Sequence, residues 1–214
     1  MSEVNNNPNI SFYNDNAEDL AEMYNSVNTE DVHSHIVSLV PKSSKVLDIG
    51  CGSGRDAYYF ASKGHSVVAV DPAVKILETA KEKYSHHNLV FLDDKLPDLE
   101  KIKGKYDVVI MSAVWMHIEK KDRLKAAKRV TNLLNPQGIA VISLRHGAFK
   151  DNRKEIPVSV DEIENILSKD LNINVSVLNE NENDNFNREG VSWQTVIIKN
   201  TDKPKLINKQ RGRR

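Results

Sequence analysis

The stretch that decides the fold reads Lys45-Val-Leu-Asp-Ile-Gly-Cys-Gly-Ser-Gly-Arg-Asp56. An apolar run, Val46 to Ile49, precedes three glycines at alternate positions, and a segment compatible with a helix follows them. Glycine permits positive φ angles and lets a ligand approach the backbone, because it has no Cβ. The first turn of a helix adds free N–H groups and the positive end of its dipole. The stretch therefore predicts a strand, a glycine turn and a helix that suit a nucleotide-like ligand.

The chain on both sides of this stretch alternates between short apolar runs and helical patterns. We expect strands at residues 46–49, 66–70, 88–92, 106–111, 139–144, 171–178 and 191–198. We expect helices at residues 15–25, 29–39, 56–63, 72–84, 122–134 and 160–168. Such alternation implies right-handed crossovers and a parallel sheet that is covered by helices on both faces. The last two strands have no helix between them and can pair as an antiparallel hairpin.

Several shorter segments between these elements also carry local signals. We expect residues 1–10 to be loose and Thr29 to cap the helix that follows it. Residues 135–138, Asn-Pro-Gln-Gly, predict a turn that ends the preceding helix. Residues 179–190 are polar and predict a surface loop between the last two strands.

The composition is that of an ordinary globular domain. The 214 residues fit one domain with a sizeable core, and 39% of them are apolar and 28% charged. A formal net charge of zero argues against a dedicated nucleic-acid binder, which usually carries a basic excess. The single cysteine, Cys51, excludes a disulfide within the chain. Because the sequence has no signal-peptide pattern and no apolar run near ~18 residues, we expect a cytoplasmic protein without membrane contact.

The spacing of the glycines leaves two kinds of ligand open. A nicotinamide or flavin site has the pattern G-x-G-x-x-G. Counted from Gly50, the third glycine falls at Arg55; counted from Gly52, it falls at Ala57, which is a tolerated variant. Asp48 discriminates better, because a carboxylate two residues before the first glycine would repel a pyrophosphate. It suits a ligand with a cationic end and no phosphate, and S-adenosylmethionine has both properties.

Residues 46–54 resemble the first motif of the class I S-adenosylmethionine-dependent methyltransferases, and the resemblance extends over about residues 40–150. It implies an α/β fold, a three-layer Rossmann-like sandwich. Its seven-stranded, mostly parallel sheet has an antiparallel last strand, and an N-terminal helical arm precedes it. We expect the arm at 1–40, a methyltransferase domain at 41–200 and a basic flexible tail at 201–214. The tail is either a solvated end or a contact for an acidic partner.

The resemblance also implies the residues that bind S-adenosylmethionine and its product, S-adenosylhomocysteine. In the family, the glycine loop packs on the amino-acid end of the cofactor, and an acid that ends the second strand binds both ribose hydroxyls. An acid after the third strand reaches the adenine, residues after the fourth strand lie beside the methionine part, and the N-terminal arm covers the sulfonium. The matching cofactor-binding residues of this chain are Tyr13, Asp48, Gly50, Gly52, Gly54, Asp71, Asp93, Asp94, Ser112 and Ala113.

Each of the acids in this set has a structural alternative. Asp48 can cap the turn that follows it, and Asp71 can cap the next helix. Asp93 and Asp94 can be solvated turn residues, and the spacing does not choose which of the two contacts adenine. Cys51, between two motif glycines, is interpreted as a small filler and not as a nucleophile.

The methyl acceptor has no motif of its own, although DNA is an improbable acceptor. Amino-directed DNA methyltransferases carry Asn/Asp-Pro-Pro-Tyr/Phe after the fourth strand, where this chain reads Met-Ser-Ala-Val-Trp-Met-His at 111–117. Cytosine-C5 enzymes need a Pro-Cys nucleophile, which Cys51 does not provide. We therefore expect a small-molecule acceptor, ahead of protein or RNA.

Two segments at the carboxyl ends of expected strands resemble a bacterial subgroup of these methyltransferases. They are Ser-Ala-Val-Trp-Met-His at 112–117 and Ser-Leu-Arg-His-Gly at 143–147. The candidate catalytic residues come from them: His117 or His146 to take a proton from the acceptor, and Arg145 to clamp a carboxylate or phosphate. His117 can instead simply pack on the sheet. No metal is expected.

The sequence therefore predicts an S-adenosylmethionine-dependent methyltransferase with an unidentified acceptor. The alternative is an NAD(P)-binding Rossmann enzyme or a non-catalytic nucleotide-binding module. Methyl transfer is an in-line displacement at an activated carbon, so positioning of the acceptor supplies much of the rate. A base is needed only where the acceptor must lose a proton.

Overall fold

A seven-stranded sheet forms the centre of the computed structural model, which describes residues 7–186 and 188–203 apart from the side chains of residues 180–183. The strand order is β3-β2-β1-β4-β5-β7-β6. The strands are β1 Lys45–Ile49, β2 Ser66–Val70, β3 Leu89–Leu92, β4 Tyr106–Ser112, β5 Leu134–His146, β6 Ile173–Asn183 and β7 Ser192–Asn200. The pairings among β1 to β5 are parallel, whereas β7 is antiparallel to both β5 and β6. The predicted mostly parallel sheet with an antiparallel last strand is confirmed.

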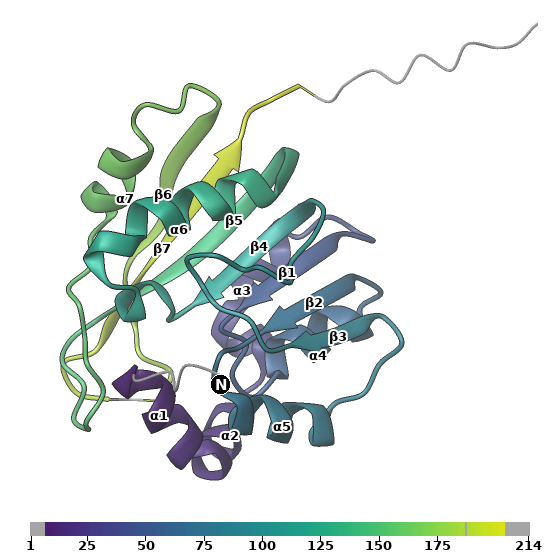
Figure 1. Cartoon of the computed structure of the whole chain (residues 1–214), viewed down its shortest axis with the longest axis vertical. Helices are drawn as coiled ribbons and strands as arrows, with labels where there is room; N and C mark the ends of the chain where they lie inside the picture. The colour runs from purple at the N-terminus through teal and green to yellow at the C-terminus, as the bar shows by residue number, and fades with distance from the viewer. Residues whose placement is uncertain (1–6, 187, 204–214) are drawn as a thin grey trace, which may run out of the picture.

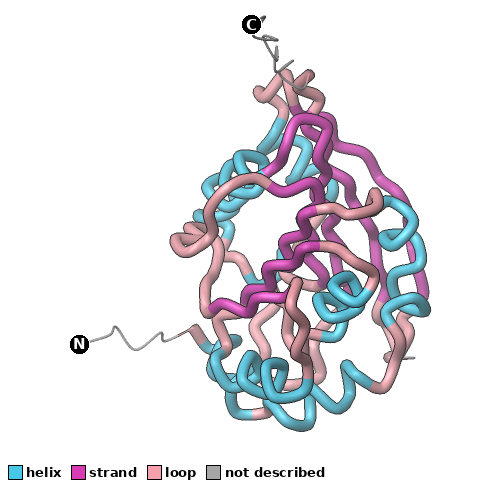
Figure 2. The backbone as a smooth tube through the Cα atoms, turned by 90° about the vertical axis from the view of Figure 1, so that its right-hand side faces the viewer, coloured by secondary structure: helices cyan, strands magenta, loops and turns pink. Residues whose placement is uncertain are grey.

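Helices cover both faces of this sheet and give a three-layer sandwich (Figures 1 and 2). The helices are α1 Pro8–Asp15, α2 Ala17–Asn25, α3 Thr29–Leu39, α4 Arg55–Ser62, α5 Val74–Lys83, α6 Lys120–Leu133 and α7 Val160–Leu167, with a short 3-10 helix, η1, at Trp115–His117. Val130 of α6 and Ile163 of α7 join the larger buried cluster on one face. Ile36 of α3 and Phe60 of α4 join a second buried cluster on the other face. The predicted Rossmann-like architecture is therefore confirmed.

The first two helices lie beside α5, across the carboxyl ends of the parallel strands (Figure 1). Leu20 and Ala21 of α2 pack with Ile76 of α5 in a third buried cluster. Asn14 Oδ1 accepts a hydrogen bond of 2.9 Å from the backbone N of Lys75 at the start of α5. These contacts hold α1 and α2 over the edge of the sheet where parallel α/β folds bind ligands.

The N-terminal arm contains a helix, α1, that the sequence did not predict. Pro8 opens α1, so residues 8–10 are helical and not loose, and the Asn7 side chain caps the helix by accepting a backbone hydrogen bond. Proline suits this position because its missing N–H has no partner in the first turn. The helix predicted at 15–25 is present as α2, and Asn16, where φ is −118°, separates it from α1.

Two strands are longer than predicted. β5 begins at Leu134, because residues 135–138 form the irregular start of the strand opposite Tyr106 instead of a free turn. β6 runs to Asn183, so the predicted loop at 179–190 begins as a strand paired with β7. In both places a backbone pairing partner outweighs the local preference of polar residues for turns.

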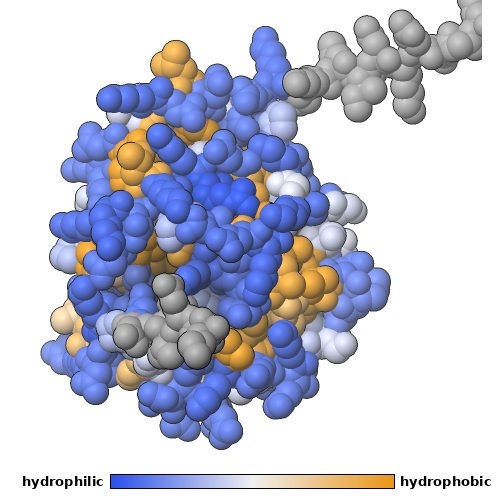
Figure 3. Space-filling model, in the orientation of Figure 1, coloured by the Kyte–Doolittle hydropathy of each residue, from blue (hydrophilic) through white to orange (hydrophobic). Residues whose placement is uncertain are grey.

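The surface over α6 is mainly hydrophilic and is interrupted by apolar patches (Figure 3). Within the part of the chain that the structure describes, none of the helices has the length and apolarity needed to cross a membrane. The expected contact of the basic tail with an acidic partner falls on residues 201–214, of which 204–214 lie outside the described residues.

Candidate functional site

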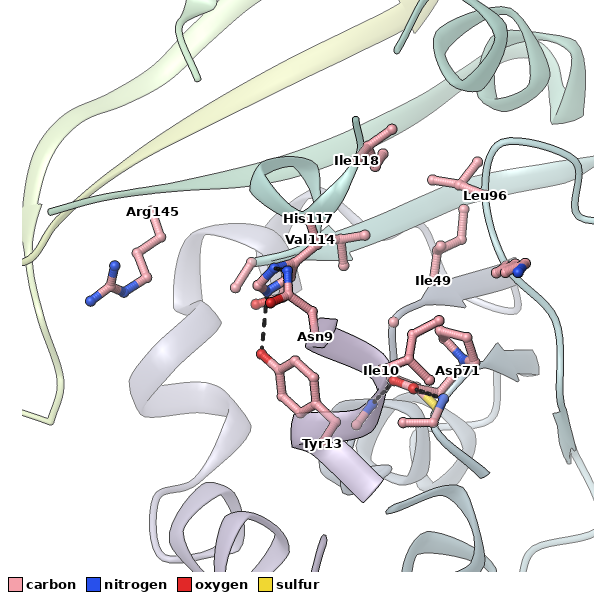
Figure 4. Close-up of a pocket in the computed structure, with 18 of the residues that line it drawn as sticks. Asn9, Ile10, Tyr13, Ile49, Asp71, Leu96, Val114, His117, Ile118 and Arg145 are labelled. Carbon is pink, nitrogen blue, oxygen red and sulfur yellow. Dashed lines mark hydrogen bonds between the residues drawn. The ribbon is translucent and has the colours of Figure 1, made fainter. Parts of the chain in front are cut away.

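A cavity of about 380 Å³ lies at the carboxyl ends of β1, β2, β4 and β5. This is the position at which open α/β sheets bind ligands. Residues that line it from the sheet and its loops include Ile49, Gly50, Gly52, Asp71, Asp94, Leu96, Ser112, Ala113, Val114, His117, Ile118, Arg145, Phe149, Arg153, Phe186, Arg188 and Trp193. Asn9, Tyr13 and Tyr24 line it from α1 and α2. Figure 4 shows Asp71 and Arg145 at opposite sides of this pocket, with His117 between them.

The glycine loop takes the left-handed backbone geometry that its sequence predicts. Gly50, Gly52 and Gly54 have φ values of 71°, 50° and 76°. A Cβ on Gly50 would lie 2.5 Å from Val114 Cγ2, so this glycine also allows β4's loop to approach closely. Gly50 and Gly52 line the cavity, whereas Gly54 lies outside the lining, where its Cβ would meet Phe91 and Ala80 on the far side of the loop. Gly54 is therefore required by packing and not by a ligand.

Asp71, at the end of β2, both supports the loop and faces the cavity. Its Oδ2 accepts a hydrogen bond of 2.9 Å from Gly52 N, and its Oδ1 accepts one of 2.9 Å from Ala73 N. Burial raises the pKa of Asp71 to about 6, with a smaller contribution from Asp93, although the two backbone hydrogen bonds oppose the shift. Each carboxylate oxygen keeps a second lone pair, which can accept a hydroxyl from a ligand.

Asp48 does not line the cavity, contrary to the prediction of a direct ligand contact. Side chains alternate along a strand, so Asp48 points to the same face as Val46, which α3 and α4 cover. Only 3% of Asp48 is exposed, and burial, together with Asp56 and Asp71, raises its pKa well above the usual range. Asp48 thus lies beneath the glycine loop.

The two acids after β3 are separated by the structure. Asp94 lines the cavity, whereas Asp93 is exposed and lies 3.7 Å from Lys101 Nζ. The Asp94 carboxylate also accepts backbone hydrogen bonds from Lys95, Glu100 and Lys101 at 2.8–3.2 Å. Asp94 therefore both caps the turn that follows it and faces the cavity. Asp93 lies outside the cavity.

The residues after β4 lie in the wall of the cavity, as predicted. Ser112 and Ala113 both line it, and Ala113 has a positive φ of 57°. Ser112 Oγ lies 3.4 Å from His33 Nε2. This contact joins the end of β4 to α3 beneath the pocket.

An ionic network ties the helical arm to the helix behind the glycine loop. Asp56 contacts Arg55 Nε at 2.8 Å and His33 Nε2 at 3.1 Å, and it accepts the Thr29 hydroxyl at 2.8 Å. Although burial alone would raise it, the pKa of Asp56 is held well below its usual range by His33 and Arg55. Thr29 is therefore not the cap of α3, which begins after Asn28.

His117 is held in one tautomer by the first helix. Asn9 Oδ1 accepts from Lys154 N at 2.7 Å and Asn9 Nδ2 donates to Lys154 O at 2.8 Å, which fixes the orientation of the amide. The same Nδ2 lies 2.9 Å from His117 Nδ1, which must therefore accept. The proton of the neutral ring is then on Nε2, 3.3 Å from the Tyr13 hydroxyl. Burial, and next Arg153, lowers the pKa of His117 to about 4, so the ring is neutral at pH 7.

The two neighbours Arg145 and His146 point to opposite faces of β5. Arg145 is 4% exposed and lines the cavity, whereas His146 lies outside the lining and is 2.9 Å from Gln194 Oε1. Alternation along the strand explains the difference, because His146 shares the face of Leu144, which belongs to the α6 and α7 side. The structure thus removes His146 from the candidate catalytic set.

Arg153, Phe149 and Asn9 are among the pocket residues that the sequence did not predict. Arg153 and Phe149 follow β5, where the general position of α/β ligand sites could have drawn attention to them. Asn9 carries no local signal, since its partners are 108 and 145 residues away in the chain.

Comparison with known proteins agrees with this fold. Residues 46–138 match the family model described as a methyltransferase domain. Among curated proteins, the chain is 27% identical over 118 residues to the putative methyltransferase YqeM of Bacillus subtilis, covering 54% of this chain and 47% of YqeM. It is 35% identical over 104 residues to the ubiquinone biosynthesis O-methyltransferase of Rickettsia canadensis, covering 46% and 42%. The match thus spans less than half the length of these relatives.

Solved structures of methyltransferases share the fold over most of the chain. A TehB-like S-adenosylmethionine-dependent methyltransferase from Corynebacterium glutamicum superposes with a TM-score of 0.63 at 19% identity, covering 90% of this chain and 98% of that one. The 1,6-didemethyltoxoflavin-N1-methyltransferase of Burkholderia thailandensis superposes with a TM-score of 0.65 at 18% identity, covering 90% and 87%. Residues 46–138 therefore match a methyltransferase domain in sequence, and the chain as a whole has the fold of these S-adenosylmethionine-dependent methyltransferases.

Proposed function

We propose that this protein binds S-adenosylmethionine and transfers its methyl group to a small-molecule acceptor. The observation that carries the proposal is the single cavity that joins the glycine loop and Asp71 to Arg145 and His117. One end supplies hydrogen-bond acceptors and backbone turns, and the other supplies a buried cation and aromatic rings. This division suits a cofactor bound at the Asp71 end and a methyl acceptor bound at the Arg145 end, with their reacting atoms between the two ends.

The residues at the Asp71 end fit the cofactor. The two Asp71 oxygens, each with a free lone pair, match the paired hydroxyls of a ribose. Leu96, Ile118 and Ile49 line the same side and offer apolar surface to a planar base (Figure 4). Gly50 and Gly52 present backbone without Cβ atoms to the amino-acid end. When bound, the cofactor supplies a methyl group that is already activated by the sulfonium.

Tyr13 and Tyr24 extend this fit from the helical arm. Both aromatic side chains line the cavity from α1 and α2, and Figure 4 shows Tyr13 between Asp71 and Arg145. The face of an aromatic ring attracts a cation, so this position favours a sulfonium. The arm also covers the cavity and limits the access of water.

The chain's own groups position the acceptor and do not include His117 as a base. Its Nδ1 accepts from Asn9, and its Nε2–H faces Tyr13, so neither nitrogen has a lone pair available to the pocket. We infer that His117 orients Tyr13, and that the rate comes mainly from holding the acceptor atom close to the methyl group.

A small-molecule acceptor is favoured by the similar proteins of known substrate. The relative from Rickettsia canadensis is a ubiquinone biosynthesis O-methyltransferase, and the structure from Burkholderia thailandensis contains 1,6-didemethyltoxoflavin. Both names describe small organic acceptors. A cavity of about 380 Å³ fits ligands of this size better than it fits a nucleic acid or a folded protein.

Calorimetry with S-adenosylmethionine, S-adenosylhomocysteine and NAD tests the proposal. We expect both sulfur ligands to bind and NAD to give no heat. Asp71→Asn should weaken S-adenosylhomocysteine by ~1–3 kcal/mol, because the neutral amide loses a charged acceptor. Asp93→Asn is the matched control, since Asp93 lies outside the cavity, and it should leave the affinity unchanged. Binding of NAD without either sulfur ligand would overturn the proposal.

A further inference from the structure

Three arginines line the end of the cavity that lies away from Asp71: Arg145, Arg153 and Arg188. Two of them have carboxylates of their own. Arg153 NH2 lies 2.6 Å from Asp151 Oδ2, and Arg188 NH2 lies 2.6 Å from Asp184 Oδ1. The charges of these two arginines are therefore already balanced within the protein.

Arg145 differs from the other two arginines. Among the side chains that the structure describes, none contributes a carboxylate within 4.0 Å of Arg145. Its terminal nitrogens donate to the backbone oxygens of Gly147 and Ala148, and its buried Nε has no hydrogen-bond partner. Glu155 and Asp184 act on Arg145 only at longer range, and Arg188 and Arg153 repel it. The residue as a whole is buried, with 4% of its surface exposed.

A buried cation without a counterion is costly, because its hydration is lost and not replaced. The cost is recovered when an anionic ligand enters the same site. Arg145 therefore gives this end of the cavity one unbalanced positive charge, next to a volume that a ligand can occupy.

Aromatic rings surround this charge. The guanidinium of Arg145 lies 4.2 Å from the centre of the Phe149 ring, and Phe149 is also stacked with His117 at 5.7 Å. Trp193, which pairs with Arg145 across β5 and β7, and Phe186 also line the cavity. Flat apolar walls of this kind favour a planar, aromatic ligand over a branched or strongly hydrated one.

We propose that the methyl acceptor is a small aromatic carboxylate, and that Arg145 binds its carboxylate. The inference rests on the proposed function, because it assigns the acceptor of the same pocket. A carboxylate carries one negative charge and balances Arg145, whereas a phosphate monoester carries nearly two at neutral pH. A guanidinium also matches the planar carboxylate group with two parallel N–H donors.

The test measures binding of benzoate, benzamide and phenyl phosphate to the full chain saturated with S-adenosylhomocysteine. Calorimetry gives the affinities, and thermal denaturation gives the shift in Tm. We expect benzoate to bind about tenfold or more tightly than benzamide, which is the effect of one charge-assisted hydrogen bond. Arg145→Met should abolish this preference, and Arg145→Lys should retain part of it. Lys169→Met, at an exposed position in the turn after α7, is the control for removing a positive charge and should keep the preference.

The outcomes separate this inference from the proposed function. Equal binding of benzoate and benzamide, tighter binding of phenyl phosphate, or a preference that survives Arg145→Met would each overturn the aromatic carboxylate. If Arg145→Met does not fold, the inference is tested by the affinities of the three ligands for the wild-type protein and by the reduced benzoate preference of Arg145→Lys. The same titrations without S-adenosylhomocysteine show whether the preference for benzoate over benzamide requires the bound sulfur ligand. Failure of the sulfur ligands to bind, with the benzoate preference intact, overturns the proposed methyltransferase function and leaves Arg145 as a binding site for aromatic carboxylates that are not methyl acceptors.

Discussion

The side-chain amide of Asn9 pairs with both backbone groups of Lys154, at 2.7 Å from Lys154 N and 2.8 Å from Lys154 O. This pair closes the first helix over the segment that follows β5. Asn9→Leu removes both hydrogen bonds and leaves Lys154 N and O without these partners, so we expect a loss of ~1–3 kcal/mol in the free energy of unfolding. Urea denaturation measures it. Asn165→Leu, at an exposed position on α7, is the control. An equal loss of stability in both variants would show that the Asn9–Lys154 hydrogen bonds do not contribute to it.

The same amide fixes the tautomer of His117, and burial of the ring sets its protonation state. Because its folded pKa is about 4 and an unfolded histidine titrates near 6.5, the folded state binds the proton more weakly. The stability that this group contributes is complete above pH 6.5 and is lost as the pH falls toward 4. NMR titration of the imidazole should therefore show no protonation at pH 6. In Asn9→Asp, a carboxylate beside Nδ1 should raise the pKa, and a titration unchanged from wild type would refute the assigned tautomer.

Asp71 should make cofactor affinity and protein stability respond to pH in opposite directions. Its folded pKa is raised to about 6, so the folded protein holds this proton more tightly than the unfolded chain does. Stability from this group is therefore present below its unfolded pKa and is lost as the pH rises through about 6. Ribose hydroxyls favour the ionised carboxylate, so S-adenosylhomocysteine should bind about tenfold more weakly at pH 5 than at pH 7. Calorimetry at several pH values measures this slope, which Asp71→Asn should remove.

Gly50 and Val114 should behave as a coupled pair. Gly50→Ala places a Cβ 2.5 Å from Val114 Cγ2 and forces alanine into a left-handed conformation, which alone costs about 1–2 kcal/mol. Val114→Ala removes the steric part, so the double variant should be more stable than the sum of the single effects predicts. Thermal denaturation of all four proteins measures the coupling. Strict additivity would mean that the loop moves away from Val114 instead of clashing with it.

The order of strands and helices could be predicted from the sequence because each element carries its own periodic signal. Val46 to Ile49 and Ser66–Val70 are apolar on both faces, which is typical of buried parallel strands. Sequence patterns were less informative where a partner strand decides the conformation. Residues 135–138 and the end of β6 have turn-like composition, yet they pair with neighbours that are distant in the chain.

The candidate site could be predicted where the signal is local. The positive φ angles of Gly50 and Gly52 and the position of Asp71 at a strand end follow from the motif itself. It was harder to predict on which face of its strand a side chain near the pocket lies. Asp48 and His146 were both expected in the pocket, and the alternation of side chains along β1 and β5 turns both away from it.

The sequence by itself determined the strand, glycine turn and acid that make a nucleotide-like cradle, because these depend on short-range backbone geometry. Only the tertiary structure decided the acceptor end of the pocket. It brings Asn9 to His117 across 108 residues and so fixes the tautomer of the ring. It also gives Arg153 and Arg188 their own carboxylates and leaves Arg145 buried without one. Charge balance of this kind depends on which side chains meet in space, and spacing along the chain does not encode it.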